Sequence, residues 1–349
     1  MILAGKCSGL LSSRAIMKTA VALFLFNRPE PTARVFAQIA KAAPPQLFLI
    51  ADGPRDDRAT DAEQCAATRR VVEQIDWPCR VHTNFAPRNM GCTQRMATGI
   101  DWVFDHAEEA IILEDDCLPD PTFFPFCEEL LARYREDSRV MQIAGFSIPL
   151  DRRTRAFSYY FSRFATNWGW ATWRRAWQHY DVGVKEWPAL KETSWLMDIV
   201  RHPSIAASWG RMLDLAHRHE LGTWDYQWLF ACWRQQGLSV QPTVSMITNL
   251  GFGEGATHTV STCHDPRAEV SAAPIGFPLR HPEIFVESPT ADRIYKRQVI
   301  LPSACDRGLI TQIYKKWWEF TGAHPSLKSW KTLSRRLLEK SLSLIGVSG

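Results

Sequence analysis

The stretch Ala110-Ile111-Ile112-Leu113-Glu114-Asp115-Asp116 places three carboxylates directly behind four apolar residues. A short apolar run of this kind predicts a buried strand, so the acidic triplet is expected at its carboxyl end. Upstream, the apolar runs Val21 to Phe26 and Leu47 to Ile50 enclose Pro31 to Lys41, which has helical spacing. This order predicts a strand–helix–strand unit.

The alternation of predicted strands and helices continues further along the chain. Arg80 to Thr83 and Val140 to Ala144 are strand-like, and Thr93 to His106 has Met96, Ile100 and Phe104 on one helical face. Strands separated by helices of this length predict an α/β fold, Rossmann-like, with a mostly parallel sheet flanked by helices. Ligands of such sheets gather at the carboxyl ends of the strands.

The composition changes after about residue 150, because ten of the fifteen Trp residues lie between 168 and 233. We interpret this region as a Trp-rich helical lobe. The predicted organisation has four parts: an N-terminal extension over 1–18, an α/β half over 19–150, a second half of the same domain over 151–308 and a basic amphipathic tail over 309–349. Met17 is an alternative start to Met1.

Charge and cysteine usage exclude several classes of protein. The formal net charge is +4, but residues 309–349 alone hold seven basic and two acidic side chains. The rest offers no basic stripe for nucleic acid. Nine cysteines without a C-x-x-C pair favour reduced thiols and a cytoplasmic location. The longest apolar run, Ala20 to Phe26, is too short to span a bilayer, and the first sixteen residues lack the apolar stretch of a secretory signal.

Polar residues also follow the first two predicted strands. Asn27-Arg28-Pro29 ends the first, and Asp52-Gly53 ends the second, on the same rim as the acidic triplet. Arg28 there suits a phosphate and Asp52 a ribose hydroxyl or a base N–H, while the alternative is a pair of ordinary turns. Carboxylates at Glu114 to Asp116 suit Mn²⁺ or Mg²⁺ when a diphosphate supplies further ligands; the alternative is a solvated acidic loop.

Motifs of other nucleotide-handling enzymes are absent from the sequence. It contains no G-x-G-x-x-G after the first strand, no G-x-x-x-x-G-K-[ST] and no G-x-S-x-G. These absences argue against a dehydrogenase, a P-loop enzyme and an α/β hydrolase. A carboxylate-held divalent ion that bridges a diphosphate is the remaining economical solution.

The order of these motifs resembles the GT-A nucleotide-sugar glycosyltransferases. Asn27-Arg28, Asp52-Gly53 and the acidic triplet, followed by Pro119, Phe123 and Phe124, are most similar to the N-acetylglucosaminyltransferase I family and its bacterial relatives. The similarity continues through 167–173, 223–228 and 251–259. It covers roughly residues 20 to 260, and the joint order is more specific than any single motif.

The resemblance implies a role for individual residues on the donor side. Asp116 would be the direct metal ligand, with Glu114 and Asp115 oriented toward the donor sugar and ribose. Arg28 and Asp52 would hold the nucleotide. A loop at Gly251 to His258 would fold over the donor, which brings Thr257 and His258 toward the diphosphate. Arg88 and Arg95 lie near the segment that contributes further nucleotide contacts in the family.

On the acceptor side, Asp225 matches the catalytic base of the family. A second acidic residue follows it there, whereas this sequence has Tyr226. Indole faces suit the C–H face of a sugar ring, so Trp170 and Trp224 are the candidates for an acceptor platform among tryptophans that mostly form core. In the tail, basic residues with Trp and Leu at helical spacing favour peripheral contact with an anionic membrane; the alternative is a surface helix packed on the domain.

The sequence therefore predicts a metal-dependent inverting glycosyltransferase. It would move a sugar from a nucleotide-sugar, in particular a UDP-sugar, to a hydroxyl of a glycan or glycolipid acceptor, in polysaccharide biosynthesis. Two alternatives stay open. A sugar-nucleotide pyrophosphorylase or other nucleotidyltransferase shares the sheet and the metal, and a non-catalytic carbohydrate-binding protein would explain the Trp content without Asp116 or Asp225.

Overall fold

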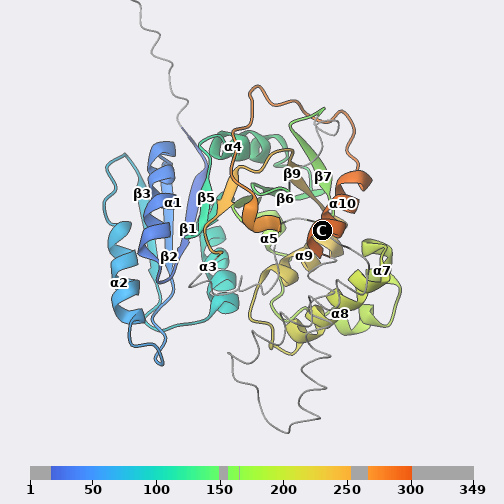
Figure 1. Cartoon of the computed structure of the whole chain (residues 1–349), viewed down its shortest axis with the longest axis horizontal. Helices are drawn as coiled ribbons and strands as arrows, with labels where there is room; N and C mark the ends of the chain where they lie inside the picture. The colour runs from blue at the N-terminus through green and yellow to red at the C-terminus, as the bar shows by residue number, and fades with distance from the viewer. Residues whose placement is uncertain (1–16, 149–155, 165, 253–265, 301–349) are drawn as a thin grey trace, which may run out of the picture.

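The computed structural model describes residues 17–148, 156–164, 166–252 and 266–300. Its centre is a twisted sheet with helices on both sides (Figure 1). The strands are β1 (Ala20–Leu25), β2 (Gln46–Ala51), β3 (Arg80–Phe85), β4 (Glu109–Glu114), β5 (Cys117–Pro119), β6 (Val140–Ala144), β7 (Tyr159–Ser162), β8 (Trp170–Trp173), β9 (Leu238–Pro242) and β10 (Ile247–Asn249).

The helices lie between these strands and after the last of them. They are α1 (Pro29–Ala42), α2 (Asp61–Val71), α3 (Cys92–His106), α4 (Phe123–Arg133), α5 (Arg174–Trp177), α6 (Trp187–Lys191), α7 (Trp195–Val200), α8 (Pro203–His217), α9 (Asp225–Arg234) and α10 (Pro289–Tyr295), with a 3₁₀ turn η2 (Pro266–Glu269) and a π-helical turn η3 (Lys296–Ile300).

The order of strands in the large sheet creates a crevice. Eight strands run β3-β2-β1-β4-β8-β6-β9-β7. The chain moves outward from β1 through β2 to β3 and then returns to pair β4 with the other side of β1, and all these pairings are parallel. Ligands of α/β sheets bind outside the carboxyl ends of the strands where the order reverses in this way. The point of reversal here lies between β1 and β4.

The two faces of the sheet bury separate apolar clusters. Val21 and Leu23 of β1 pack with α1 and α4 on one face, whereas Ala22 and Phe24 pack with α3 and with α8 and α9 on the other. Every residue of β1 is buried. A continuous apolar run is what a strand covered on both faces requires, so the sequence pattern of β1 follows from its central place.

The predicted organisation after residue 150 was wrong at one element. Residues Trp170–Trp173 form strand β8, which pairs antiparallel with β4 and β6 in the middle of the sheet. Antiparallel β7 and parallel β9 extend the same sheet, which makes it mixed, with more parallel than antiparallel neighbours. Helices do follow at α5 to α9. The two predicted halves therefore share one sheet.

A second, two-stranded sheet of β5 and β10 lies beside the crevice. It brings Asn249 opposite Cys117, one residue beyond the acidic triplet.

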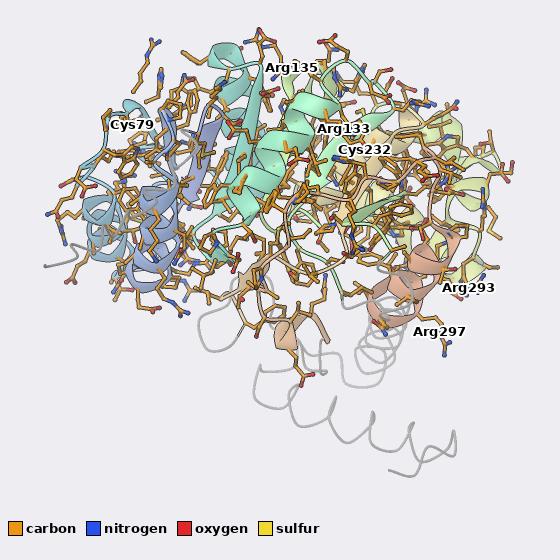
Figure 2. All side chains as sticks on the ribbon, turned by 90° about the horizontal axis from the view of Figure 1, so that it is seen from above. Cys79, Arg133, Arg135, Cys232, Arg293 and Arg297 are labelled. Atoms are coloured by element: carbon orange, nitrogen blue, oxygen red, sulfur yellow. The ribbon has the colours of Figure 1, made fainter. Side chains whose placement is uncertain are left out.

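The cysteines in the described ranges are all free thiols, namely Cys65, Cys79, Cys92, Cys117, Cys127 and Cys232. Figure 2 shows Cys232 within the molecule, and Arg293 and Arg297 at its surface near α10.

Two parts of the chain bear on membrane contact: the described helices and the basic tail. Within the described ranges, no helix combines the length and the apolar character needed to cross a bilayer. The basic tail at 309–349, for which contact with an anionic membrane was predicted, lies outside those ranges.

Candidate functional site

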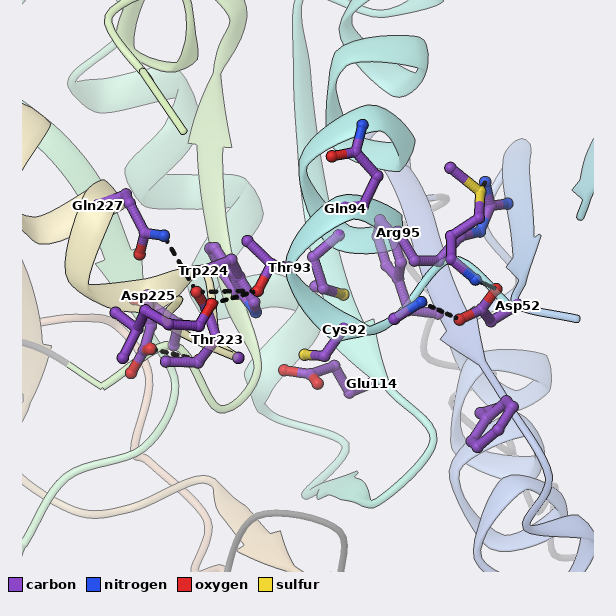
Figure 3. Close-up of a pocket in the computed structure, with 18 of the residues that line it drawn as sticks. Asp52, Cys92, Thr93, Gln94, Arg95, Glu114, Thr223, Trp224, Asp225 and Gln227 are labelled. Atoms are coloured by element: carbon purple, nitrogen blue, oxygen red, sulfur yellow. Dashed lines mark hydrogen bonds between the residues drawn. The ribbon is translucent and has the colours of Figure 1, made fainter. Parts of the chain in front are cut away.

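A cavity of about 870 Å³ opens at the point where the strand order reverses. Its volume is typical of small-molecule sites, which span about 300–1,000 Å³. The first turn of α3 and the start of α9 face it from opposite sides (Figure 3). Eight of the residues predicted from the sequence line it: Arg28, Asp52, Arg95, Glu114, Asp115, Asp116, Trp224 and Asp225.

Arg28 is paired with two of the three carboxylates. Its Nη2 contacts Asp115 Oδ1, and its Nη1 lies 3.0 Å from Asp116 Oδ2. The Phe26 N–H donates to the other oxygen of Asp115 at 3.1 Å. Burial works against ionisation of Arg28, but the charges of Asp115 and Asp116 prevail and raise its pKa above the usual value. Arg28 therefore anchors the acidic triplet in this conformation, rather than reaching into the cavity as an unpaired phosphate clamp.

The triplet carries more negative charge than Arg28 offsets. Burial raises the pKa of Glu114, and the neighbouring charges of Asp116 and Asp115 raise it further. Burial also raises the pKa of Asp115, although Arg28 opposes the shift. Carboxylates that gain protons because they are crowded and withdrawn from water are a common feature of functional sites.

Asp116 is more exposed than its neighbour Asp115. Its side chain is 15% exposed, against 3% for Asp115. Its Oδ2 lies so close to Gly251 that a Cβ added there would approach it to 2.3 Å. The backbone N–H of Leu250 donates to the Asp116 carbonyl at 2.7 Å. The segment after β10 is thus fitted closely around Asp116, and a side chain at 251 would displace the Asp116 carboxylate.

Asp52 organises a loop through its hydrogen bonds, a role that the sequence does not indicate. Its Oδ1 accepts from the N–H groups of Gly53 and Met90, and its Oδ2 accepts from Asn89 Nδ2 and the Gly91 N–H, at 2.8 to 3.2 Å. Four donors occupy the carboxylate. Asp52 therefore holds the loop at 89–91 in place, and it is this loop, rather than the Asp52 carboxylate, that presents polar groups to the cavity.

The two further arginines are placed differently. Arg95 is buried in the first turn of α3 and donates to the Asn84 carbonyl and side chain. Burial lowers its pKa, and its Nε has no hydrogen-bond partner in the described part of the chain. Arg88 is exposed and does not line the cavity; its backbone is the close neighbour that restricts position 53 to glycine.

Asp225 stands opposite the acidic triplet, at the first residue of α9. It is exposed, and the Thr223 hydroxyl donates to its Oδ1 at 2.6 Å. A negative side chain at a helix N-terminus is electrostatically favourable. Thr93 of α3 donates to the carbonyls of Leu221 and Thr223, which joins the two sides of the cavity (Figure 3).

The tryptophans are mainly core. Trp170 is 1% exposed, does not line the cavity and stacks on Trp224 with ring centroids 5.6 Å apart. Trp224 lines the cavity but is itself buried. Trp170 is thus a support behind Trp224, not part of an exposed platform. Thr257 and His258 lie outside the described residues.

Several lining residues were not found from the sequence. Asn89 to Cys92 belong to the loop that Asp52 organises, and Trp168 and Arg267 face the cavity from beyond the strands, with the Arg267 guanidinium carbon 5.0 Å from the Trp168 ring centre. A Gly before a helix, here Gly91 with φ 77°, is the one local signal, because this left-handed backbone conformation favours glycine. Arg267 has no such signal, because only tertiary structure brings it to Trp168.

Comparison with known proteins adds little to this geometry. No family model matches the chain, and no curated protein matches its sequence. Among solved structures, the crystal structure of residues 1–349 of TarS from S. aureus is similar with a TM-score of 0.32 and 9% identity. The match covers 48% of this chain and 50% of that one, so the chain spans about half of the length it is compared with. At this level of likeness the comparison supports no assignment.

Proposed function

We propose that the protein is a metal-dependent inverting glycosyltransferase of GT-A type that uses a nucleotide-sugar, most simply a UDP-sugar. The observation that supports this best is the juxtaposition across one cavity. A cation-receptive acidic triplet lies at the strand reversal, and an exposed carboxylate, Asp225, lies opposite it. Donor activation and acceptor deprotonation need these two groups on opposite sides of one bound substrate.

The donor set at the triplet fits a hard divalent ion such as Mn²⁺ or Mg²⁺. Asp116 would hold it, because its oxygens are harder ligands than sulfur or imidazole and its side chain is the more open. In the described part of the chain, no group of three or more His, Cys, Asp or Glu side chains is placed to hold a metal. The ion would therefore depend on phosphate oxygens and water, and when bound it supplies positive charge beside a diphosphate leaving group.

The N-terminus of α3 supports a diphosphate at the same place. Gly91, Cys92, Thr93 and Gln94 line the cavity, and no side chain caps the first N–H groups of this helix. Such groups, together with the helix dipole, bind phosphate well. Arg95 adds a buried positive charge nearby.

The chemistry assigned to this chain's own residues is a single displacement. The acceptor oxygen attacks the anomeric carbon from the face opposite the diphosphate, and its proton passes to an oxygen of Asp225. The bond between the anomeric carbon and the diphosphate oxygen breaks, and its electron pair leaves with the diphosphate. No covalent enzyme intermediate is needed, so the configuration at the anomeric carbon inverts.

The alternative of a non-catalytic carbohydrate-binding protein has less support. Of the ten tryptophans between 168 and 233, all except Trp168 and Trp195 are buried, and those two are half-buried. An indole platform for a glycan would have to be exposed. The Trp content is explained by the core on one face of the sheet.

Product analysis tests the proposal. The wild-type protein is incubated with Mn²⁺ and UDP-, GDP- and TDP-sugars, and release of the nucleoside diphosphate is followed with and without mixed oligosaccharide acceptors. We expect release with one nucleotide only, dependence on the metal, and a product of inverted configuration by NMR. Formation of a nucleoside triphosphate from pyrophosphate and the nucleotide-sugar would instead identify a pyrophosphorylase.

A further inference from the structure

A smaller cavity branches from the main one at Asp225. It has a volume of about 150 Å³. Asp225, Tyr226, Trp168, Asn167 and Arg267 line both cavities. We call it the side cavity. The residues that line it alone are Phe164, Thr166, Trp209, Leu229, Tyr295, Val299 and Ile300.

Eight of the twelve residues that line it are aromatic or aliphatic, although polar atoms make up more of its exposed surface than apolar atoms. Trp209 packs on Tyr226 with ring centroids 4.6 Å apart, and Phe164 stacks on Tyr295 at 6.2 Å. Trp209 is also held against Trp233 at 4.5 Å. The rings are therefore fixed by their neighbours. Flat, rigid apolar surfaces of this kind suit the C–H face of a sugar ring.

The same wall contains polar atoms that lack partners. Thr166 is 8% exposed, and its hydroxyl makes no hydrogen bond within the described ranges. The side-chain oxygen of Asn167 is in the same state. Leaving a buried polar atom unpaired costs free energy. Both oxygens have almost no accessible surface in this structure, so the wall must shift slightly for the hydroxyl groups of a ligand to pair with them.

The volume limits what that ligand can be. At about 150 Å³ the side cavity is smaller than the roughly 300–1,000 Å³ of a typical small-molecule site, so it suits a group the size of one sugar ring. A nucleotide does not fit, and neither do two linked sugars.

Building on the proposed function, we infer that the side cavity is the acceptor subsite and that it takes a single monosaccharide ring, the terminal sugar of the acceptor. One hydroxyl of this ring lies at Asp225, which borders both cavities, and others pair with Thr166 and Asn167. The enzyme then extends glycans at their ends. A terminal ring has one glycosidic bond and needs one opening, which the main cavity beside Asp225 provides, whereas an internal ring needs two.

Binding of simple glycosides tests the inference without turnover. The probes are the methyl glycosides of glucose, galactose, mannose and N-acetylglucosamine, added to the full chain with a nucleoside diphosphate and Mg²⁺, which is not paramagnetic. Saturation-transfer NMR reports contact between the glycoside and aromatic side chains. We expect one glycoside to give signal over its whole ring. Leu229→Trp, which fills the cavity, should weaken its binding at least tenfold.

Milder variants keep the test independent of folding. Thr166→Val removes only the hydroxyl and should weaken glycoside binding about threefold or more, whereas Thr166→Ser should restore it. Met197→Trp, at an exposed position on α7 outside both cavities, is the control of matched size and should change nothing. Calorimetric binding of the nucleotide should stay as in the wild type in all four.

The outcomes separate the two proposals. If the nucleotide binds but no methyl glycoside does, or if glycoside binding is unchanged in Leu229→Trp and Thr166→Val, the acceptor subsite is elsewhere. If signal arises only with oligosaccharides and spreads over several rings, the acceptor is not a terminal sugar held here. If no nucleotide binds to the wild type, it is the glycosyltransferase proposal itself that fails.

Discussion

The two sides of the cavity treat their polar atoms in opposite ways. At the strand ends, each carboxylate oxygen of Asp52, Asp115 and Asp116 has a donor from the protein. In the side cavity, the oxygens of Thr166 and Asn167 have none among the described residues. These three carboxylates are thus fixed before any ligand arrives, although the Nε atoms of Arg28 and Arg95 on the same side lack partners among the described residues, whereas the two oxygens of the side cavity would gain partners only from a ligand. We interpret the first as the donor side and the second as the acceptor side.

Loss of the Asp225 carboxylate, which borders both cavities, should have the largest effect, and this effect is on the rate of sugar transfer. Asp225→Asn keeps the shape but removes the base, and a positioned base contributes about 10²–10⁴-fold in rate. Transfer should fall by that factor, while calorimetric nucleotide binding stays unchanged because donor contacts lie across the cavity. Asp198→Asn, exposed on α7, is the control. If nucleotide binding falls in Asp225→Asn as much as the rate of transfer does, Asp225 belongs to the donor side, and the distinction between a donor side and an acceptor side fails.

On the donor side, the best test of internal organisation is Asp52→Asn. The amide would turn its NH₂ toward two donors, Asn89 Nδ2 and the Gly91 N–H, which now bond to Oδ2. Unpaired buried donors cost about 1–3 kcal/mol. Denaturant unfolding should show a loss of stability in this range and none in the exposed control Asp76→Asn. An unchanged midpoint would mean that the loop at 89–91 does not depend on Asp52.

Close packing around Asp116 can be broken by one methyl group. In Gly251→Ala the added Cβ would meet Asp116 Oδ2 at 2.3 Å, so the carboxylate must shift. Metal-dependent nucleotide binding should weaken roughly tenfold, about 1.4 kcal/mol. The same substitution at Gly276, where nothing lies within 4 Å of the new Cβ, should have no effect. Equal affinities for the two variants would show that the position of Asp116 is unimportant for binding.

The acceptor side should respond least to a comparable change. Thr166→Val removes a hydroxyl that has no partner in the described chain, so no bond is lost on folding. We expect the free energy of unfolding to change by less than about 0.5 kcal/mol, or to rise slightly, because an unpaired buried group is removed. A loss as large as that of Asp52→Asn would mean that Thr166 is already paired in the protein.

The first part of the fold could be predicted because its signals are local. Strands β1, β2 and β4 are continuous apolar runs, and a run buried on both faces needs no other context. Helix α2 was missed because only Asp61, Cys65 and Thr68 face the protein, which leaves no apolar periodicity. Strand β8 lies within the predicted helical lobe, because four residues with two tryptophans do not distinguish a central strand from a helix.

The site was predictable to a different extent on its two sides. Residues at strand ends could be placed together, because parallel strands bring their carboxyl ends to one edge. What each carboxylate bonds to could not be predicted: three of the four donors to Asp52 come from 37 to 39 residues further along the chain. Trp168 and Arg267 meet only through tertiary packing. Local pattern thus predicts where a site lies better than it predicts its contacts.

The central claim is that Asp116 and its neighbours form a metal-dependent nucleotide site. Calorimetric titration with UDP, GDP and TDP, with Mn²⁺ and again with EDTA, tests it most directly, on the wild type, on Asp116→Asn and on Asp105→Asn, an exposed control at the far end of α3. If Asp116 holds the metal, one nucleotide binds, and this binding needs the metal, persists in Asp105→Asn and is lost in Asp116→Asn. Binding that is unaffected by EDTA and by Asp116→Asn, or no binding at all, would contradict it.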